Sequence, residues 1–188
     1  MKRYLFYLGH PAHFHLFKHV IGALKTEGHA VEVLIKTKDV LESLLQEAGW
    51  AYRNILEQGR GPSKFEIAWS LLVRDAAVLR AAREFQPDLM VGTSAAITHV
   101  GRLLGIPSVV VNEDDADTVP LFSWLAYPFA DVILAPTPCR VGRWERKTVR
   151  YEGYHELAYL HPNHFAPNEG ITKALAPSEG RYVVLRLA

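Results

Sequence analysis

The sequence has little of several features that mark large classes of proteins. Its 188 residues include one cysteine, Cys139, so no disulfide can form within the chain, as is usual in a reducing compartment. No apolar run reaches the length of a membrane span, and the early run YLFYL is too short for a signal peptide. The net charge is only +1, which gives no reason to expect binding to nucleic acid. We therefore expect a protein of the cytoplasm, either free or peripheral to the membrane, with no integral membrane segment.

Several motifs of catalysis and cofactor binding are also missing. The chain contains no Walker P-loop, no G-x-G-x-x-G and no G-x-S-x-G, which argues against NTPase, dinucleotide-binding and serine-hydrolase functions. His10, His13 and His15 are close in sequence, but no fourth metal ligand follows at a recognisable spacing. The sequence therefore predicts no metal site and no bound cofactor.

The pattern of apolar residues predicts an α/β fold. Short apolar runs, most of them apolar throughout, are typical of strands buried on both faces, and they alternate with segments of helical period. The expected strands are 3–8, 30–35, 51–56, 88–92, 108–112, 131–135 and 148–152. The first expected helix carries an apolar stripe over residues 14–24 and ends at EGH, residues 27–29, and the others are 39–49, 65–84, 95–104 and 119–129. This order predicts right-handed crossovers, and so a Rossmann-like parallel sheet with helices on both faces.

The end of the chain departs from this alternation. We expect residues 1–153 to form the first domain and residues 154–180 to form a linker between domains. The final run RYVVLRLA, residues 181–188, reads as the first strand of a truncated second domain. A native reading frame that continues past Ala188 would support a two-domain protein, whereas a stop there would support a module that acts with a separate partner.

In a parallel sheet, ligands bind beyond the carboxyl ends of the strands, which directs attention to His13. This residue follows the first strand and lies near the start of the first helix, whose positive end favours a neutral imidazole. A neutral imidazole can take a proton from a substrate hydroxyl, so His13 is the candidate general base. His10 and His15 either support the turn or contact the substrate.

A second group of candidates lies in the acidic stretch NEDDAD. Asp117 can serve as the cap of the following helix, but one helix needs one cap, and Glu113, Asp114 and Asp115 exceed that need. Glu113 and Asp114 come directly after a strand, where an acid could orient His13 or bind sugar hydroxyls. The sequence leaves both roles open, together with a third one, in which these acids only compensate the dipole of the following helix.

Two further loops offer binding groups. Thr93 and Ser94, in GTSAA, supply hydroxyls and helix N–H groups that suit an anion or a hydroxyl. Arg60, in EQGRGPSK, supplies a cation for a phosphate, although a plain solvent-exposed connection is the commoner meaning of such a loop.

Three stretches carry a resemblance to known families. GHPAHFHLFKHVIGALKTEGHAVEVL and GYHELAYLHPNHFAP resemble a bacterial and archaeal family of unknown function that has a GT-B-like fold. PDLMVGTSAAITHVGRLLGIPSVVVNEDD resembles the N-terminal domain of GT-B glycosyltransferases, above all the GlcNAc transferases of peptidoglycan synthesis, and more distantly UDP-GlcNAc 2-epimerases.

The resemblance implies two Rossmann-like domains and no metal. The first domain would bind mainly the acceptor, and the second would bind mainly a nucleotide-sugar donor. His13 matches the histidine that follows the first strand in the transferases, and Glu113 matches their loop glutamate. The turn GHPAHFH replaces the glycine-rich turn of those transferases, which argues against close phosphate approach at this turn.

The sequence thus predicts the acceptor-binding half of a metal-independent glycosyltransferase. His13 would take the proton of an acceptor hydroxyl, on a small molecule, a glycan or a lipid-linked acceptor. Two alternatives remain: an enzyme like the nucleotide-sugar 2-epimerases, and a non-catalytic module that binds an acceptor or a partner. As the half of a transferase, this chain alone would be inactive.

Overall fold

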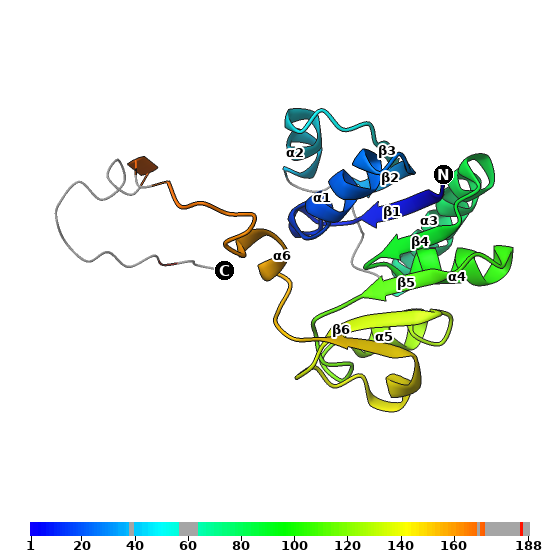
Figure 1. The fold of residues 1–188 in the computed structure, drawn as a ribbon. Coiled ribbons are helices and arrows are strands. Elements are labelled where there is room, and N and C mark those ends of the chain that lie inside the picture. Colours follow the sequence, from blue (N-terminus) through cyan, green and yellow to red (C-terminus); the bar gives the residue numbers. More distant parts are fainter. Residues whose placement is uncertain (38–39, 57–63, 169, 172–184, 186–188) are drawn as a thin grey trace.

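The fold is a parallel sheet with helices on both faces (Figure 1). The computed structural model describes residues 1–37, 40–56, 64–168, 170–171 and 185, which form a seven-stranded sheet in the order β3-β2-β1-β4-β5-β6-β7. Every neighbouring pair of strands is parallel. The strands are β1 (Arg3–Leu8), β2 (Ala30–Lys36), β3 (Arg53–Leu56), β4 (Leu89–Gly92), β5 (Ser108–Val111), β6 (Val132–Pro136) and β7 (Thr148–Tyr151). The predicted Rossmann-like α/β class is confirmed.

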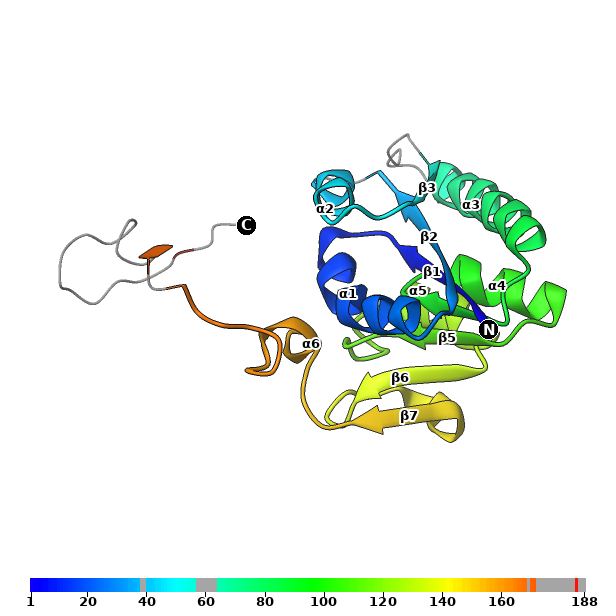
Figure 2. The same ribbon diagram turned by 45° about the horizontal axis from the view of Figure 1, so that its top comes forward.

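Helices cover both faces of the sheet (Figures 1 and 2), and each face buries its own cluster of apolar side chains. Side chains alternate along β1: Leu5 and Tyr7 join the cluster of one face, and Phe6 and Leu8 join that of the other. The first face is covered by α3 (Lys64–Phe85), α4 (Ala95–Leu104) and α5 (Pro120–Ala126). The second face is covered by α1 (Pro11–Thr26) and α2 (Leu41–Glu47).

The strand order reverses at β1, and this reversal creates the place for a site. The chain leaves β1 for a helix on one face and leaves the adjacent β4 for a helix on the other. The two connections diverge, so a crevice opens at the carboxyl ends of these strands, as in other open α/β sheets. The candidates His13 and Thr93 follow these two strands.

The structure corrects the prediction for the segment around α5. The expected helix 119–129 ends at Ala126, and its N-cap is Val119, which makes no side-chain capping bond. Asp117 does not cap the helix, because its carboxylate forms an ion pair with Arg140 at 3.1 Å. A charged guanidinium donor is a stronger partner than a backbone N–H group. A short 3₁₀ helix, η1 (Gly142–Lys147), was not predicted.

The chain after β7 contains a further helix, α6 (Leu157–Leu160), which packs against α1. The Tyr159 ring lies 5.3 Å from the His15 ring, and the His164 ring stacks on that of His19 at 4.2 Å. The expected strand 181–188 lies outside the described residues, apart from Leu185. The division into domain, linker and second domain therefore stays a prediction. In the described part of the chain, no helix combines the length and apolarity that crossing a bilayer requires.

A partly buried histidine, His99, links the three helices of the first face and makes stability depend on pH. His99 donates from Nδ1 to Asp75 at 2.8 Å and from Nε2 to the Leu125 carbonyl at 2.8 Å, so both ring nitrogens carry a proton. The bond to Asp75 raises the pKa of His99 above its usual 6.5. This stabilisation is therefore fully present below about pH 6.5 and is lost as the pH rises through the folded pKa.

We expect the replacement His99→Gln to expose this dependence. The wild type should exceed the variant in unfolding free energy by about 1–3 kcal/mol at pH near 5.5, the range for hydrogen bonds to charged groups, and by less near pH 8.5. Urea unfolding at the two pH values measures the difference. An equal difference at both would show that His99 is neutral.

Candidate functional site

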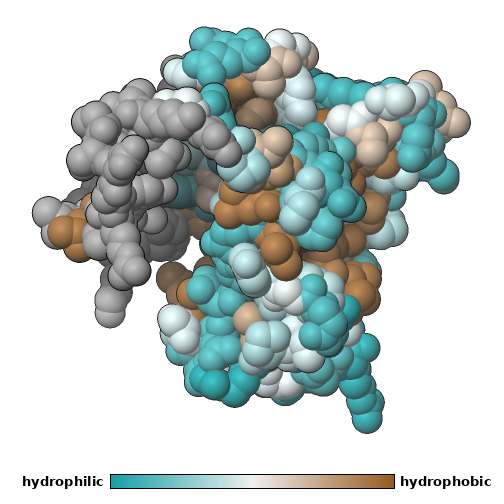
Figure 3. Space-filling model, turned by 60° about the vertical axis from the view of Figure 1, so that its left-hand side comes forward, coloured by the Kyte–Doolittle hydropathy of each residue, from teal (hydrophilic) through white to brown (hydrophobic). Residues whose placement is uncertain are grey.

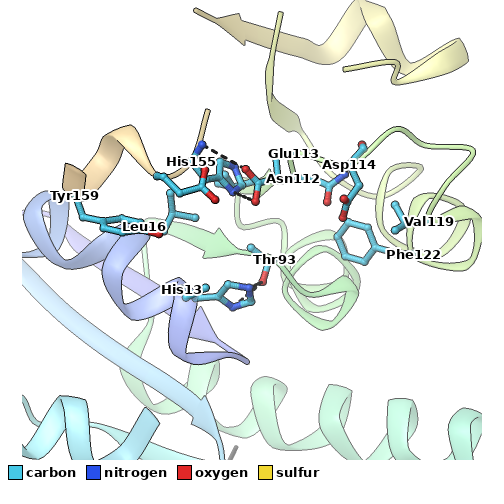
Figure 4. Close-up of a pocket in the computed structure, with 13 residues that line it drawn as sticks. His13, Leu16, Thr93, Asn112, Glu113, Asp114, Val119, Phe122, His155 and Tyr159 are labelled. Carbon is cyan, nitrogen blue, oxygen red and sulfur yellow. Dashed lines mark hydrogen bonds and ion pairs between the residues drawn. The ribbon is translucent and has the colours of Figure 1, made fainter. Parts of the chain in front are cut away.

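A pocket of about 290 Å³ opens at the carboxyl ends of β1, β4 and β5 (Figure 4). It lies at the reversal of strand order, and helices α1, α5 and α6 contribute to its walls. The residues that line it are Ala12, His13, Leu16, Thr93, Val111, Asn112, Glu113, Asp114, Val119, Phe122, His155, Glu156 and Tyr159. The structure thus brings His13, Thr93, Glu113 and Asp114 to one pocket.

His13 lies in the first turn of α1, and the turn before it fixes the imidazole. His10 is the N-cap of α1, where its Nδ1 accepts the N–H of Ala12 at 3.2 Å. The N–H of Gly9 donates to Nδ1 of His13 at 3.1 Å. Oγ1 of Thr93 lies 3.0 Å from Nδ1 and 3.1 Å from Nε2 of the same ring. The ring is therefore held by groups from β1 and β4 on the floor of the pocket.

Glu113 and His155 lie side by side at the pocket, joined by the dashed lines of Figure 4. Oε1 of Glu113 lies 3.3 Å from Nδ1 of His155, and Oε2 accepts the backbone N–H of His155 at 3.3 Å. The His155 side chain is 13% exposed, and this burial lowers its pKa despite the nearby carboxylate. The histidine that pairs with Glu113 is thus His155, whereas the sequence suggested that an acid at this position could orient His13.

The rest of the acidic loop is held by its own contacts. The Asn112 side chain donates to the carbonyl of Asp114 at 2.8 Å and to the Tyr127 hydroxyl at 2.9 Å. Asp114 lines the pocket. Asp115 does not line it, because its carboxylate accepts the backbone N–H of Arg140 at 2.7 Å and pairs with the guanidinium at 2.6 Å.

The remaining candidates lie beside the pocket or beyond the described residues. His10 caps α1, and its ring lies 5.9 Å from that of His13. His15 contacts α6, outside the pocket lining. Ser94 caps α4 and lines an adjoining pocket of about 560 Å³, which shares His13 and Thr93 with the first. Arg60 lies outside the described residues.

His155 was not among the candidates from the sequence, although a signal for it was present. It follows β7 by four residues, so the rule that sites form at the carboxyl ends of strands applies to it as it does to His13. This segment was expected to be a linker between domains, so His155 was not expected at the site. Helix α6 then folds back on α1 and carries Glu156 and Tyr159 to the same pocket.

An apolar groove of about 550 Å³ adjoins the polar pocket on the side of α1 and α6. The two share Leu16, Val111 and His155. Figure 3 shows apolar side chains gathered in a band between the upper and lower parts of this face. Two polar atoms along the groove, the hydroxyl of Tyr151 and Nε2 of His155, are buried without a hydrogen-bond partner among the described residues.

The site contains no arrangement that suggests a metal. Among the described residues, no three histidine, cysteine or acidic side chains are grouped so that they could hold a metal ion. The polar groups that face the pocket are carboxylates, imidazoles, a hydroxyl, an amide and a phenol. These groups are suited to binding hydroxyls and moving protons.

Sheet order and helix arrangement together define the class of fold: a Rossmann-like α/β domain, similar to one half of proteins with the GT-B fold. No family model and no curated protein matches the sequence. Solved structures do match in fold. MurG of Acinetobacter baumannii has a TM-score of 0.62 at 16% identity, over 81% of this chain and 45% of that chain. S. aureus MnaA, solved with UDP, has a TM-score of 0.67 at 14% identity, over 93% and 52%.

The spinosyn rhamnosyltransferase SpnG, complexed with thymidine diphosphate, has a TM-score of 0.57 at 19% identity, over 82% of this chain and 50% of that chain. The chain therefore spans about half the length of the structures that it matches. At such low sequence identities, the similarity to these structures shows a shared fold and nothing more. It agrees with the GT-B-like resemblance that the sequence motifs carry.

Proposed function

We propose that the chain is the acceptor-binding half of a GT-B-type enzyme that acts on a nucleotide sugar, with glycosyl transfer as the reaction. The supporting observation is the single pocket that collects His13, Thr93 and Glu113 from the ends of three strands. Proteins of the same fold have been solved with UDP and with thymidine diphosphate, which supports a nucleotide sugar as the donor.

The charge of the pocket favours an acceptor over a diphosphate. Three carboxylates line it, those of Glu113, Asp114 and Glu156, and no lysine or arginine is among its lining residues. A diphosphate would be repelled by these acids, whereas sugar hydroxyls donate readily to carboxylates. This pocket therefore suits the acceptor better than the diphosphate of the donor.

Transfer requires one group in the pocket to take a proton. As the acceptor hydroxyl loses its proton to that group, the oxygen forms a bond to the anomeric carbon of the donor. The bond between that carbon and the diphosphate oxygen breaks, and the nucleoside diphosphate leaves with the electron pair. The sequence assigns the proton to His13, and the structure adds Glu113 with its partner His155 as a second candidate. No step in this scheme needs a metal.

Two other functions use the same geometry. A reaction like that of the 2-epimerases would act on the donor sugar itself, and UDP-GlcNAc 2-epimerase of Neisseria meningitidis, solved with UDP-GlcNAc, shares the fold at a TM-score of 0.66. A non-catalytic module would bind the acceptor or a partner without turnover. The acidic pocket favours the transferase over the epimerase, because carboxylates suit a hydroxyl-bearing acceptor, which the epimerase reaction does not use.

Nucleotide-sugar binding by the product of the complete native gene tests the proposal. A ligand present at about 100 times its Kd adds roughly 2.7 kcal/mol to the unfolding free energy, which raises Tm by several degrees. We expect such a shift with at least one uridine or thymidine diphosphate sugar, and none with ATP as control. If no nucleotide sugar raises Tm, neither the transferase nor the epimerase function stands.

A further inference from the structure

We infer that the two histidines of the pocket hold opposite neutral tautomers, which makes His13 a hydrogen-bond donor and Glu113, positioned by His155, the proton acceptor. The tautomers follow from hydrogen bonds within the chain. The chemical roles rest on the proposed function. The inference replaces the general base expected from the sequence with a different residue of the same pocket.

The backbone decides the tautomer of His13. The N–H of Gly9 donates to Nδ1, so this nitrogen presents a lone pair and the proton of a neutral ring resides on Nε2. A proton on Nδ1 would point at the N–H of Gly9 and cost that hydrogen bond. A ring rotated by 180° would place a carbon there instead and leave the same N–H without its acceptor. His13 therefore offers an N–H at Nε2, and this nitrogen has no lone pair with which to take a proton.

Thr93 does not reverse this assignment. Its Oγ1 lies at nearly equal distances, 3.0 and 3.1 Å, from the two ring nitrogens. A hydroxyl in line with one nitrogen would be clearly farther from the other, so Oγ1 lies over the ring and not along the N–H direction of either. It restrains the ring without deciding which nitrogen carries the proton.

His155 is fixed in the opposite sense. Its Nδ1 faces the Glu113 carboxylate at 3.3 Å, which requires an N–H there, because a lone pair would repel the charged oxygen. Burial lowers the pKa of His155, so the ring is neutral and Nε2 is left bare. Nε2 is buried and has no partner among the described residues, which is less costly for a lone pair than for an N–H group. The Nδ1–H tautomer satisfies both nitrogens better than the alternative.

This arrangement leaves Glu113 ready to take a proton. Oε2 of Glu113 accepts the backbone N–H of His155, and Oε1 lies 3.3 Å from Nδ1 of its ring, so each oxygen keeps a lone pair for a substrate hydroxyl. The Glu113 side chain is 40% exposed, so a ligand in the pocket can reach it.

The acceptor hydroxyl gives its proton to Glu113 as its oxygen bonds to the anomeric carbon, and Glu113 later releases that proton to water. His13 meanwhile donates from Nε2 to a neighbouring oxygen of the acceptor.

The test is a long-range ¹H–¹⁵N correlation spectrum of the ¹⁵N-labelled chain near neutral pH. Two-bond and three-bond couplings from the ring protons distinguish a protonated from a bare nitrogen in each histidine. We expect His13 with the proton on Nε2 and His155 with the proton on Nδ1. The opposite tautomer at either residue, or a doubly protonated ring, would overturn its assigned role. Sequential assignment through the ring carbons identifies the two residues without a variant.

The positioning role of His155 has its own test in Glu113→Gln, which keeps the size of the side chain and removes its charge. Without the carboxylate, the two tautomers of His155 should become mixed, while His13 keeps its own. A structural His155 would keep the Nδ1–H form in this variant, and that result would remove the link to Glu113. These spectra need no ligand, so a chain with the expected tautomers and no affinity for nucleotide sugars would contradict the proposed function alone.

Discussion

If the proposed transfer reaction is correct, the replacement Glu113→Gln is expected to lower its kcat/KM at least roughly 100-fold, the lower end of what a positioned base contributes. Glutamine fills the same space and can accept one hydrogen bond, but it cannot take the proton of an acceptor hydroxyl. Steady-state kinetics, with circular dichroism to verify folding, measures the effect. Glu145→Gln is the matched control. Glu145 lies on η1, pairs with Arg150 of β7 and does not line the pocket. An equal loss of activity in Glu113→Gln and Glu145→Gln would show that the loss does not depend on the pocket, and would contradict the role of Glu113 as the base.

Two replacements of His13 separate a donor from a base. His13→Ala removes the Nε2–H and should also lower kcat/KM roughly 100-fold, as the loss of one positioned donor does. His13→Gln places an amide N–H near the position of Nε2 and should recover most of that loss. If His13 were the base, both variants would be equally inactive. Full turnover by His13→Ala would remove this residue from the mechanism altogether.

The replacement Gly92→Ala should destabilise the fold by about 2–3 kcal/mol, the range for overpacking at a site that cannot relax. Gly92 ends β4, where a Cβ atom would lie 2.7 Å from the carbonyl oxygen of Tyr7 and 3.2 Å from its Cβ. The nearest obstacle is backbone in the centre of the sheet, so it cannot turn away as a side-chain tip would. The displacement would also move Thr93 and the floor of the pocket.

Gly22→Ala is the control for this prediction. Gly22 lies within α1, and a Cβ atom there meets nothing within 4 Å. Alanine is favoured over glycine in a helix by up to about 1 kcal/mol, so this variant should be more stable than the wild type. Urea unfolding of both variants gives the comparison. A Gly92→Ala variant within about 0.5 kcal/mol of the wild type, the spread of ordinary surface changes, would contradict the close approach of β1 and β4.

The fold could be predicted from the sequence because local pattern and tertiary packing agree in most of the chain. All seven expected strands exist, and the central ones are readily predicted because a strand buried on both faces is apolar along its whole length. The helix expected at 65–84 is α3, Lys64–Phe85, because Pro87 and a long periodic stretch mark its end. The segment 119–129 was harder to predict, because its residues are apolar nearly all round and give no clear boundary.

The site was predictable only in part, because its pairings depend on elements that are distant in sequence. The position of His13 and Glu113 at strand ends follows from the order of strands and helices. The partner of Glu113 does not, since His155 reaches it only when the chain after β7 folds back over the pocket. The tautomer of His13 depends on a backbone N–H whose direction no sequence pattern reveals.

Product analysis of the complete native protein, incubated with a nucleotide sugar and a panel of sugar acceptors, tests the central claim most directly. The account predicts that a nucleoside diphosphate and a glycosylated acceptor appear together, in equal amounts, only when both substrates are present. Conversion of the donor sugar to its epimer without an acceptor, or tight donor binding with no product at all, would contradict it.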